Sequence, residues 1–315
     1  MKYPESFFKE NINNVLKDTN INIGKKISGK VRDSYVFDGY RLLVATDRLS
    51  AFDRILTQIP FKGEILTKLS LYWFAKTKDI IQNHVVDILA PNAVLVKNCK
   101  VVPLEVIVRG YLTGSIWRSY AAGESLKDIK LPKGLKQYYK FPKPIVGFTT
   151  KAAVGDHDEP VSCKEILDRK IVSEKELDKI SETALLLYTR GNEMVNKNDL
   201  ILVDTKYEFG KLDDELILVD EIHTQDSSRY ILKNEFEKHG IIKELDKEYF
   251  RKWLMERNYK GDGEPPEITE KIRIELIIKY IEAYKKITSS EIELVPLKSN
   301  FNEEIRKALS RYITK

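Results

Sequence analysis

The chain has 315 residues, of which 42% are hydrophobic and 10% aromatic, and its 53 basic and 48 acidic residues give a net charge of +5. This composition excludes an intrinsically disordered chain, and the mild, evenly spread charge does not indicate a nucleic-acid binder. At about 150 residues per domain, the length suggests two domains or one large one. The two cysteines, Cys99 and Cys163, cannot build a disulfide framework or a four-cysteine zinc site, and no stretch resembles a secretion signal or a membrane span. We therefore expect a protein of the reducing cytoplasm.

The first third of the chain is rich in β-strand patterns. Two strand-like runs within residues 31–46 flank Asp38-Gly39, and this pair indicates a hairpin because both central residues of a type I′ turn need positive φ. Further strand-like runs cover residues 93–96 and 101–109, and apolar residues at helical spacing predict a helix over 65–76. The first third should form a twisted sheet with one helix.

The remainder begins with a stretch that favours irregular structure. Four prolines between residues 131 and 160 predict a long loop, and Ser173 with Glu176 then forms the capping-box pattern of a helix. Strand-like runs at residues 200–209 and 215–222 are expected to pair. Three helical patterns close the chain, at residues 246–256, 269–287 and 302–313. This order predicts an α+β fold rather than a doubly wound parallel sheet.

A glycine–lysine pair precedes the first hairpin. The segment from Gly24 to Val31 matches GxxxxGK, but Val31 replaces the hydroxyl residue of a Walker A loop and a hairpin follows where a helix is required, so we reject a P-loop. A glycine beside a lysine ahead of a hairpin can still cover phosphates, as the glycine-rich loop of kinases does, with Lys30 and Arg32 on one face of the strand. An ordinary turn with a solvated basic edge is the alternative, and spacing alone favours it.

The most informative pattern is VDTKYEFG followed by LVDE in the next strand-like run. On a strand, Asp204, Lys206 and Glu208 share one face. If the turn centres on Asp214, Glu208 lies opposite Asp220, and two carboxylates so close need a cation between them. Mg²⁺ is suited to this place because one or two carboxylates bind it together with substrate phosphates. A solvent-exposed hairpin with its polar residues outward is the alternative.

Two further groups of polar residues could bind anions. Glu105 and Arg109 share a face of their strand, and Ser115 is expected to cap a helix, so that Arg109 and the free N–H groups of the helix start would suit a phosphate or carboxylate. A capped helix with a structural arginine is equally compatible with the pattern. Asp226 and Arg229, in the stretch DSSR, could bind sugar hydroxyls and an anion, although such a stretch is more often only a turn.

Together these stretches resemble one enzyme family. The motifs of phosphoribosylaminoimidazole-succinocarboxamide synthase (SAICAR synthetase) are matched in order, over about residues 27–285, by GKVRDSY, ATDRLSAFD, KGEILTKLSLYWF, VPLEVIVRGYLTGS, TKAAVGDHDE, VDTKYEFG and LVDEIHTQDSSRY. The length resembles the single-function fungal-type form. The resemblance implies a ligase of purine biosynthesis that joins 5-amino-1-(5-phospho-D-ribosyl)imidazole-4-carboxylate to L-aspartate, splits ATP to ADP and phosphate, requires Mg²⁺ and proceeds through an acyl phosphate.

The resemblance also implies a fold and the ligands of the nucleotide. It predicts a small antiparallel-sheet nucleotide-binding domain similar to that of kinases and a larger α+β domain related to ATP-grasp proteins. The residues expected to hold the phosphates of ATP are Gly29, Lys30 and Arg32. Those expected to hold Mg²⁺ are Glu208 and Asp220.

Catalytic and substrate-binding roles follow from the same resemblance. Lys206 is expected beside the phosphates and Asp204 near the substrate, and both are taken as catalytic. The residues expected to bind the imidazole substrate, or to lie in its neighbourhood, are Arg109, Ser115, Asp226, Arg229, Asp53, Lys151 and His157.

We expect the chain to divide into a β-rich nucleotide-binding domain (1–110), a substrate and metal domain (111–290) and a helical extension (291–315) that lies beyond the resemblance and serves packing or oligomerisation. One departure concerns the site: the family usually reads Thr-Pro-Asp where this chain has Gln225 before Asp226, so the fixed φ of proline is lost there. Its partners are expected to be small molecules, without nucleic acid or membrane, and a homo-oligomer is left open. Two alternatives to this function stay open: a ligase for a different acid or amine, and an inactive nucleotide-binding protein.

Overall fold

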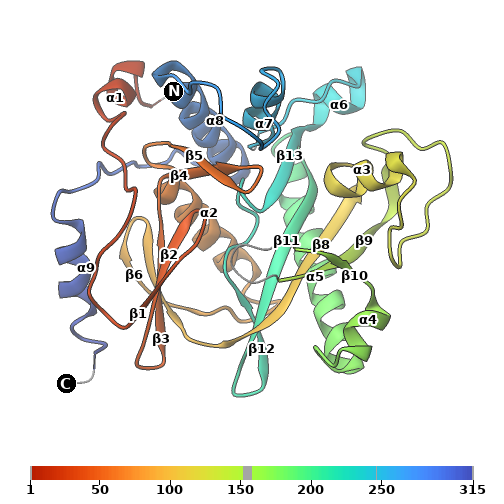
Figure 1. Cartoon of the computed structure of the whole chain (residues 1–315), viewed down its shortest axis with the longest axis horizontal. Helices are drawn as coiled ribbons and strands as arrows, with labels where there is room; N and C mark the ends of the chain where they lie inside the picture. The colour runs from red at the N-terminus through yellow and green to blue at the C-terminus, as the bar shows by residue number, and fades with distance from the viewer. Residues whose placement is uncertain (1, 152–157, 246, 314–315) are drawn as a thin grey trace.

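The computed structural model describes residues 2–151, 158–245 and 247–313, and Figure 1 shows them as a mixed α+β fold, as predicted. The described residues form two larger antiparallel sheets and one two-stranded sheet. The helices are α1 (Glu5–Glu10), α2 (Lys62–Thr77), α3 (Gly114–Ala122), α4 (Cys163–Asp168), α5 (Glu174–Asn196), α6 (Lys233–His239), α7 (Glu248–Met255), α8 (Glu270–Thr288) and α9 (Phe301–Leu309). The strands are β1 (Lys25–Ser28), β2 (Arg32–Phe37), β3 (Tyr40–Ala45), β4 (Arg48–Ala51), β5 (Arg54–Gln58), β6 (Val85–Ala90), β7 (Ala93–Lys97), β8 (Lys100–Tyr111), β9 (Lys140–Thr150), β10 (Pro160–Val161), β11 (Leu200–Leu212), β12 (Glu215–Val219) and β13 (Ser228–Leu232).

The first sheet, on the left of Figure 1, has the strand order β1-β2-β3-β7-β6. Its central hairpin turns at Asp38 and Gly39, whose φ angles of 41° and 77° are both positive, and this confirms the predicted hairpin. Helix α9 packs on this sheet, because Phe301 and Ile305 belong to the same buried cluster as Leu42. The C-terminal extension therefore supplies part of the core of the first sheet.

The second sheet has the order β10-β9-β8-β11-β12, and β13 also pairs with β11. Strand β11 lies at its centre: Asp204 is opposite Arg109 of β8, and Glu208 is opposite Glu105 of the same strand. The chain passes from the first sheet to the second between β7 and β8, so the two sheets are consecutive in sequence. The division into domains at residue 110 stays a prediction.

The prediction of an irregular loop over residues 131–160 is wrong for its central part. Strand β9 lies there and pairs with β8 over most of its length. In the described residues, β10 pairs with the other edge of β9 only at Phe148 and Thr149, so that Pro142 and Pro144 lie along an unpaired edge. An edge strand tolerates proline because it needs no donor on its open side, and for this reason the proline content was misleading.

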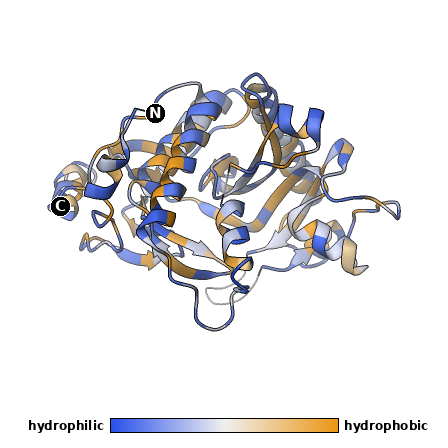
Figure 2. Cartoon of the chain, turned by 90° about the horizontal axis from the view of Figure 1, so that it is seen from above, coloured by the Kyte–Doolittle hydropathy of each residue, from blue (hydrophilic) through white to orange (hydrophobic). Residues whose placement is uncertain are grey.

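The predicted helices are confirmed in position. Ser173 and Glu176 form the expected capping box of α5, in which the Ser173 N–H donates to the Glu176 carboxylate at 2.8 Å. Helix α9 ends at Leu309 rather than at residue 313, and in the turn that follows, Tyr312 Oη donates to Asp87 Oδ2 of β6 at 2.8 Å. Figure 2 shows hydrophobic residues gathered on the inner strands and helices and polar residues on the outlying loops. Among the described residues, no helix is long and apolar enough to cross a membrane.

A β-bulge in β11 decides which side chains leave the core. Leu202 before the bulge and Tyr207 after it both pack in the large cluster beneath α5, although their positions in the strand differ in parity. The register with β13 shifts between Leu202 and Asp204, and the extra residue of a bulge reverses the alternation of side chains. Asp204 and Lys206 therefore share the face of the sheet that α5 does not cover.

Candidate functional site

The loop between β1 and β2 is a tight turn held from behind. The Gly29 N–H donates to Arg32 O at 2.8 Å, and the buried Arg48 guanidinium donates to Gly29 O at 2.9 Å and to Lys30 O at 3.2 Å. Lys30 itself precedes β2 and forms an ion pair with Asp53, at the tip of the β4–β5 hairpin. The expectation that Lys30 and Arg32 share a face of one strand is therefore wrong, because Lys30 lies in the turn.

Arg32 connects the first sheet to the end of β12. Its guanidinium forms ion pairs with Asp220 and, at 3.1 Å, with Glu221. Burial alone would lower the pKa of Arg32, but the two carboxylates outweigh it and raise that pKa above its ordinary value. The same Arg32 charge, together with that of Lys206, outweighs partial burial and holds the pKa of Asp220 below its usual range. These groups are charged and fixed in the folded protein.

Three carboxylates surround the ammonium group of Lys206. Its Nζ lies 2.6 Å from Glu208 Oε1, 3.1 Å from Glu105 Oε1 and 3.8 Å from Asp220 Oδ2. Lys151, at the end of β9, forms a further ion pair with Glu208. The carboxylates raise the pKa of Lys206 well above its ordinary value against the opposing effect of burial. Carboxylates do meet on this face, but the cation among them is the ammonium group of Lys206, and the Mg²⁺ site stays a prediction.

The register behind that prediction is off by one residue. Glu208 lies opposite Val219 and not opposite Asp220. The turn has two central residues, Asp213 and Asp214, with φ angles of 49° and 64°, rather than a turn centred on Asp214. Asp220 follows the end of β12 with a φ of 66° and reaches the cluster from beyond the strand.

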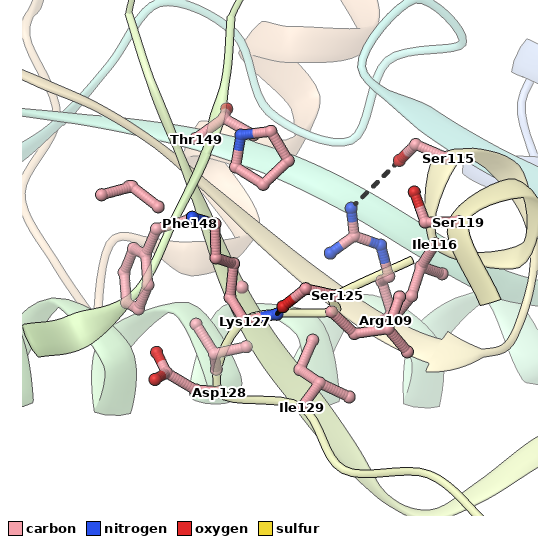
Figure 3. A pocket seen from close by; sticks show the side chains of 15 residues that line it. Arg109, Ser115, Ile116, Ser119, Ser125, Lys127, Asp128, Ile129, Phe148 and Thr149 are labelled. Carbon is pink, nitrogen blue, oxygen red and sulfur yellow. Dashed lines mark hydrogen bonds between the residues drawn. The ribbon is translucent and has the colours of Figure 1, made fainter. Parts of the chain in front are cut away.

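A pocket opens between α3, the loop that follows it and β9, and with its open mouth it encloses about 570 Å³ of empty space. Figure 3 shows the Arg109 guanidinium directed into this pocket, with Ser115 on one side and Lys127 and Asp128 on the other. Among the described residues, the guanidinium makes one hydrogen bond, a long one of 3.5 Å to Ser115 Oγ. Burial lowers the pKa of Arg109, so a cation is held here with most of its donors unused.

Asp204 lies between two arginines on neighbouring strands. It is opposite Arg109 on β8 and opposite Arg229 on β13, and Arg229 Nη1 donates to Asp204 Oδ2 at 2.7 Å. Gly114 has a φ of 64°, and a Cβ at this position would lie 2.7 Å from the Arg229 guanidinium. Glycine is therefore needed both for the backbone and for the close approach of Arg229. The helix start is capped differently from the prediction: Thr113, not Ser115, is the N-cap, and it makes no side-chain capping bond.

Asp226 is buried among donors from three helical segments. Lys62 Nζ of α2 donates to its Oδ2 at 2.8 Å, Tyr280 Oη of α8 donates to its Oδ1 at 2.8 Å, and Lys247 lies 3.9 Å away, next to α7. Burial would raise the pKa of Asp226, but Lys247 and Lys62 outweigh it and lower that pKa below the usual range. In turn, burial lowers the pKa of Lys247. Arg251, one helical turn beyond Lys247, has its Nε buried without a hydrogen-bond partner among the described residues.

A second hollow, of about 390 Å³, lies between the first sheet, α2 and the end of β12. Its walls are mostly apolar, and Arg32 and Asp220 stand at one side. The apolar residues that line it are Leu43, Ala45, Leu66, Leu71, Phe74, Val85 and Val94. Such a cavity, with charged groups at its side, suits a flat, largely apolar ring that carries an anionic chain.

The structure places the predicted site residues in several contact groups and leaves one outside the described residues. Lys30 pairs with Asp53 beside Gly29 at the glycine loop. Ion pairs connect Arg32 of β2 with Asp220, Lys206, Glu208 and Lys151. Arg229 pairs with Asp204, Arg109 bonds to Ser115 of α3, and Asp226 bonds to Lys62 and Tyr280. His157 lies outside the described residues. Lys62, Arg48 and Lys247 were not found from the sequence, because their partners are distant in the chain: a buried lysine is recognisable only when the carboxylate beside it is known.

Buried cations around a pocket and around a carboxylate cluster define an enzyme that acts on anionic small molecules. The family model of SAICAR synthetase matches residues 25–267, and the chain belongs to this family. A putative phosphoribosylaminoimidazole-succinocarboxamide synthase 2 of Agrobacterium fabrum is 43% identical over 273 residues, which cover 82% of this chain and 86% of that protein. The SAICAR synthase of Saccharomyces cerevisiae complexed with SAICAR has 34% identity and a TM-score of 0.79, and the match covers 89% of this chain and all of that one. A SAICAR synthetase in complex with ADP has 26% identity and a TM-score of 0.68, covering 86% of this chain and all of that one.

Proposed function

We propose that this chain joins the carboxylate of 5-amino-1-(5-phospho-D-ribosyl)imidazole-4-carboxylate to the amine of L-aspartate, with conversion of ATP to ADP and phosphate, in purine biosynthesis. The observation that carries the proposal is the row of side chains on β11. Asp204 accepts a hydrogen bond from Arg229 and lies opposite Arg109, the arginine that lines the pocket beside α3. Lys206 and Glu208 continue the row to the carboxylates beside Arg32. One strand therefore connects a place for an anionic substrate with a place for a nucleotide.

The nucleotide belongs between the two sheets in this proposal. The apolar hollow beside Phe74 takes the adenine ring, and Gly29, Lys30 and Arg32 face the phosphates. The hydrogen bonds from Arg48 hold the loop backbone in shape before the ligand arrives. In this respect the first sheet works as a small kinase-like nucleotide domain, and the second sheet as the larger domain related to ATP-grasp proteins.

Mg²⁺ fits the carboxylates around Lys206. Hard oxygen ligands are what this ion binds, usually one or two carboxylates together with substrate phosphates, and Glu208 and Asp220 supply them. In this structure Asp220 pairs with Arg32 and Glu208 pairs with Lys151, so Mg²⁺ would take the place of these side chains at the carboxylates. When bound, Mg²⁺ would neutralise charge on the transferred phosphoryl group.

The chemistry requires activation of the substrate carboxylate. A carboxylate is a poor electrophile, so its oxygen must become a leaving group before an amine can attack. Transfer of the γ-phosphoryl group of ATP gives an acyl phosphate and ADP; the aspartate amine then attacks the acyl carbon, loses a proton and expels phosphate. Such a transfer depends on charge stabilisation and positioning, and Lys206 and Arg32 supply positive charge that is fixed in advance.

The imidazole substrate belongs at the arginine pocket. Arg109, Ser115 and Arg229 hold its anionic groups, and Asp226 accepts hydrogen bonds from it. Helix α7 adds Arg251, whose Nε is buried without a hydrogen-bond partner among the described residues. Asp53, Lys151 and Asp204 complete the neighbourhood through their ion pairs with Lys30, Glu208 and Arg229.

The test is a coupled assay of ADP release with the purified protein. ADP release that depends on both the imidazole carboxylate and L-aspartate is the expected result. Release that depends on neither would refute the proposal, and release with another acid or amine would identify a ligase of different specificity.

The Glu208→Ala variant checks the metal site: we expect it to lose Mg²⁺-dependent turnover, and full Mg²⁺-dependent activity would overturn that assignment. The cytoplasm, small-molecule partners and the oligomeric state stay predictions.

A further inference from the structure

Gln225 is buried beside Asp226 at the position where the family usually carries proline. Its side chain is held by α8: Nε2 donates to the backbone oxygen of Tyr280 at 2.9 Å. The residue is 1% exposed, and its Oε1 is buried without a hydrogen-bond partner among the described residues. Of the two polar atoms of this buried amide, only Nε2 therefore has a hydrogen-bond partner among the described residues.

Tyr280 also binds the next residue of the loop, Asp226, through its side-chain hydroxyl. The Tyr280 hydroxyl donates to Asp226 Oδ1 at 2.8 Å, while its carbonyl oxygen accepts the hydrogen bond from Gln225. Two adjacent loop residues are thus attached to opposite ends of one buried residue of α8. Attachment at two points fixes the direction of the Asp226 carboxylate as well as its position, which one hydrogen bond cannot do.

The loop has further anchors on either side of these two residues. Thr224 and Ser227 bond to each other, with the Thr224 N–H donating to Ser227 Oγ at 3.2 Å and the Ser227 N–H donating to Thr224 O at the same distance. The Lys206 N–H donates to Ser227 O at 2.9 Å and ties the turn to β11. These bonds close the turn, whereas the bonds of Gln225 and Asp226 to Tyr280 connect it to α8.

We propose that Gln225 is a positioning residue for the imidazole substrate: by fixing the loop to Tyr280 it directs the Asp226 carboxylate toward that substrate, in place of the rigid φ that proline would supply. This inference rests on the proposed function, because it takes Asp226 as a substrate ligand. It concerns binding of one substrate only. ATP is assigned to the glycine loop and the hollow beside Phe74, and Gln225 is not among the residues that line that hollow.

The test compares Gln225→Met, which keeps the length of the side chain but removes both polar ends, with the unmodified protein. We expect the KM for the imidazole substrate to rise about three- to tenfold, with the KM for ATP and kcat within twofold of the unmodified protein. The thermal midpoint should change little, because the variant loses a hydrogen bond and also loses the unpaired Oε1. Gln225→Pro, which restores a fixed φ, should return the KM to within twofold of its original value.

Asn198→Leu is the matched control, since Asn198 Nδ2 also donates to a backbone oxygen of α8, that of Ile287 at 3.4 Å, away from Asp226. It should leave every KM unchanged. A Gln225→Met protein whose KM for the imidazole substrate equals that of this control would overturn the proposal. If Gln225→Met does not fold, Gln225→Leu supplies the second variant: it also removes the donor to the Tyr280 carbonyl, and an unchanged KM for the imidazole substrate would refute positioning by Gln225. Turnover by the unmodified protein tests the proposed function, whereas the ratio of KM values tests only Gln225.

Discussion

Two regions of the molecule hold their charges in opposite ways: the glycine loop of the first sheet, and the loop between β12 and β13 with the side chains packed against it. In the first region, Lys30 and Asp53 form a pair whose side chains are each 55% exposed. In the second, the side chains of Lys62 of α2 and Asp226 are 0% and 4% exposed. Exposed pairs contribute little free energy and exchange readily for a ligand, whereas removal of one partner of a buried pair leaves an uncompensated charge. The first region is therefore adjustable, and the second is fixed before any ligand binds.

The largest effect should come from Lys206, whose ammonium group neutralises three carboxylates. In the Lys206→Met variant, we expect kcat to fall by about 10²–10³-fold, as for loss of one fixed electrostatic contact, and the protein to be destabilised by the unpaired carboxylates. ADP release and urea unfolding measure the two effects. Lys211→Met, on the same strand but paired with Glu176 of α5, is the control and should keep its kcat. Similar rates for both variants would mean that the buried cluster is structural only.

Arg109 tests the pocket rather than the carboxylate cluster. Hydrogen bonds to a charged group are worth about 1.5–3 kcal/mol, so that Arg109→Met should raise the KM for the imidazole substrate by about 10- to 100-fold and leave the KM for ATP unchanged. Initial rates with one substrate varied at a time separate the two. Arg190→Met is the control, because Arg190 pairs with Asp79 on the outside of α5. An equal rise in both KM values would show that Arg109 supports the fold and not a substrate.

The same contrast explains how much the sequence could predict. The hairpin at Asp38-Gly39 and the capping box at Ser173 depend on neighbouring residues, and the structure confirms both. The row of Asp204, Lys206 and Glu208 follows from the alternation of a strand, but the ion pairs of Lys206 with Glu208 and of Arg229 with Asp204 were not predicted.

Long-range features were missed or misplaced for physical reasons. A two-residue turn in place of a longer one shifts the pairing by one residue, so Asp220 does not lie opposite Glu208. Strand β9 is stabilised by pairing with β8, which is distant in the sequence, and its prolines made the local pattern look irregular. The partners of Asp226 come from α2 and α8, more than 50 residues away on either side, and no spacing rule connects them.

The pH dependence of stability should depend on His223 in the second region. Burial lowers the pKa of His223 to about 3, and its Nε2 lies 2.5 Å from the Tyr207 hydroxyl. Because the unfolded chain takes up a proton that the folded chain does not, stability falls as the pH falls from about 6.5 toward 3, at about 1.4 kcal/mol per pH unit. His84, with a pKa of about 4, acts in the same direction, whereas Asp47, with a pKa raised to about 6, opposes it between its unfolded value of 3.8 and 6.

Replacement of His223 isolates its contribution. When the pH is lowered from 7 to 5, the unfolding free energy of the His223→Gln variant should decrease by about 2 kcal/mol less than that of the unmodified protein. Urea denaturation at pH 7 and at pH 5 measures the difference. His239→Gln is the control, because His239 lies exposed at the end of α6 and should leave the pH dependence unchanged. An unchanged pH dependence in the His223 variant would contradict its burial as a neutral ring.

The smallest effect is expected at the glycine loop, where Lys30 is exposed and its partner Asp53 can exchange for a phosphate. An exposed contact between opposite charges is worth about 1 kcal/mol or less, so Lys30→Met should raise the KM for ATP by no more than about fivefold and leave the unfolding free energy unchanged. Added salt should weaken ATP binding in the unmodified protein more than in the variant, because exposed charges are screened. Asp53→Asn removes the competing partner and should lower the KM for ATP. A large loss of stability in the Lys30 variant would instead place the loop with the fixed, buried region and remove the contrast between the two.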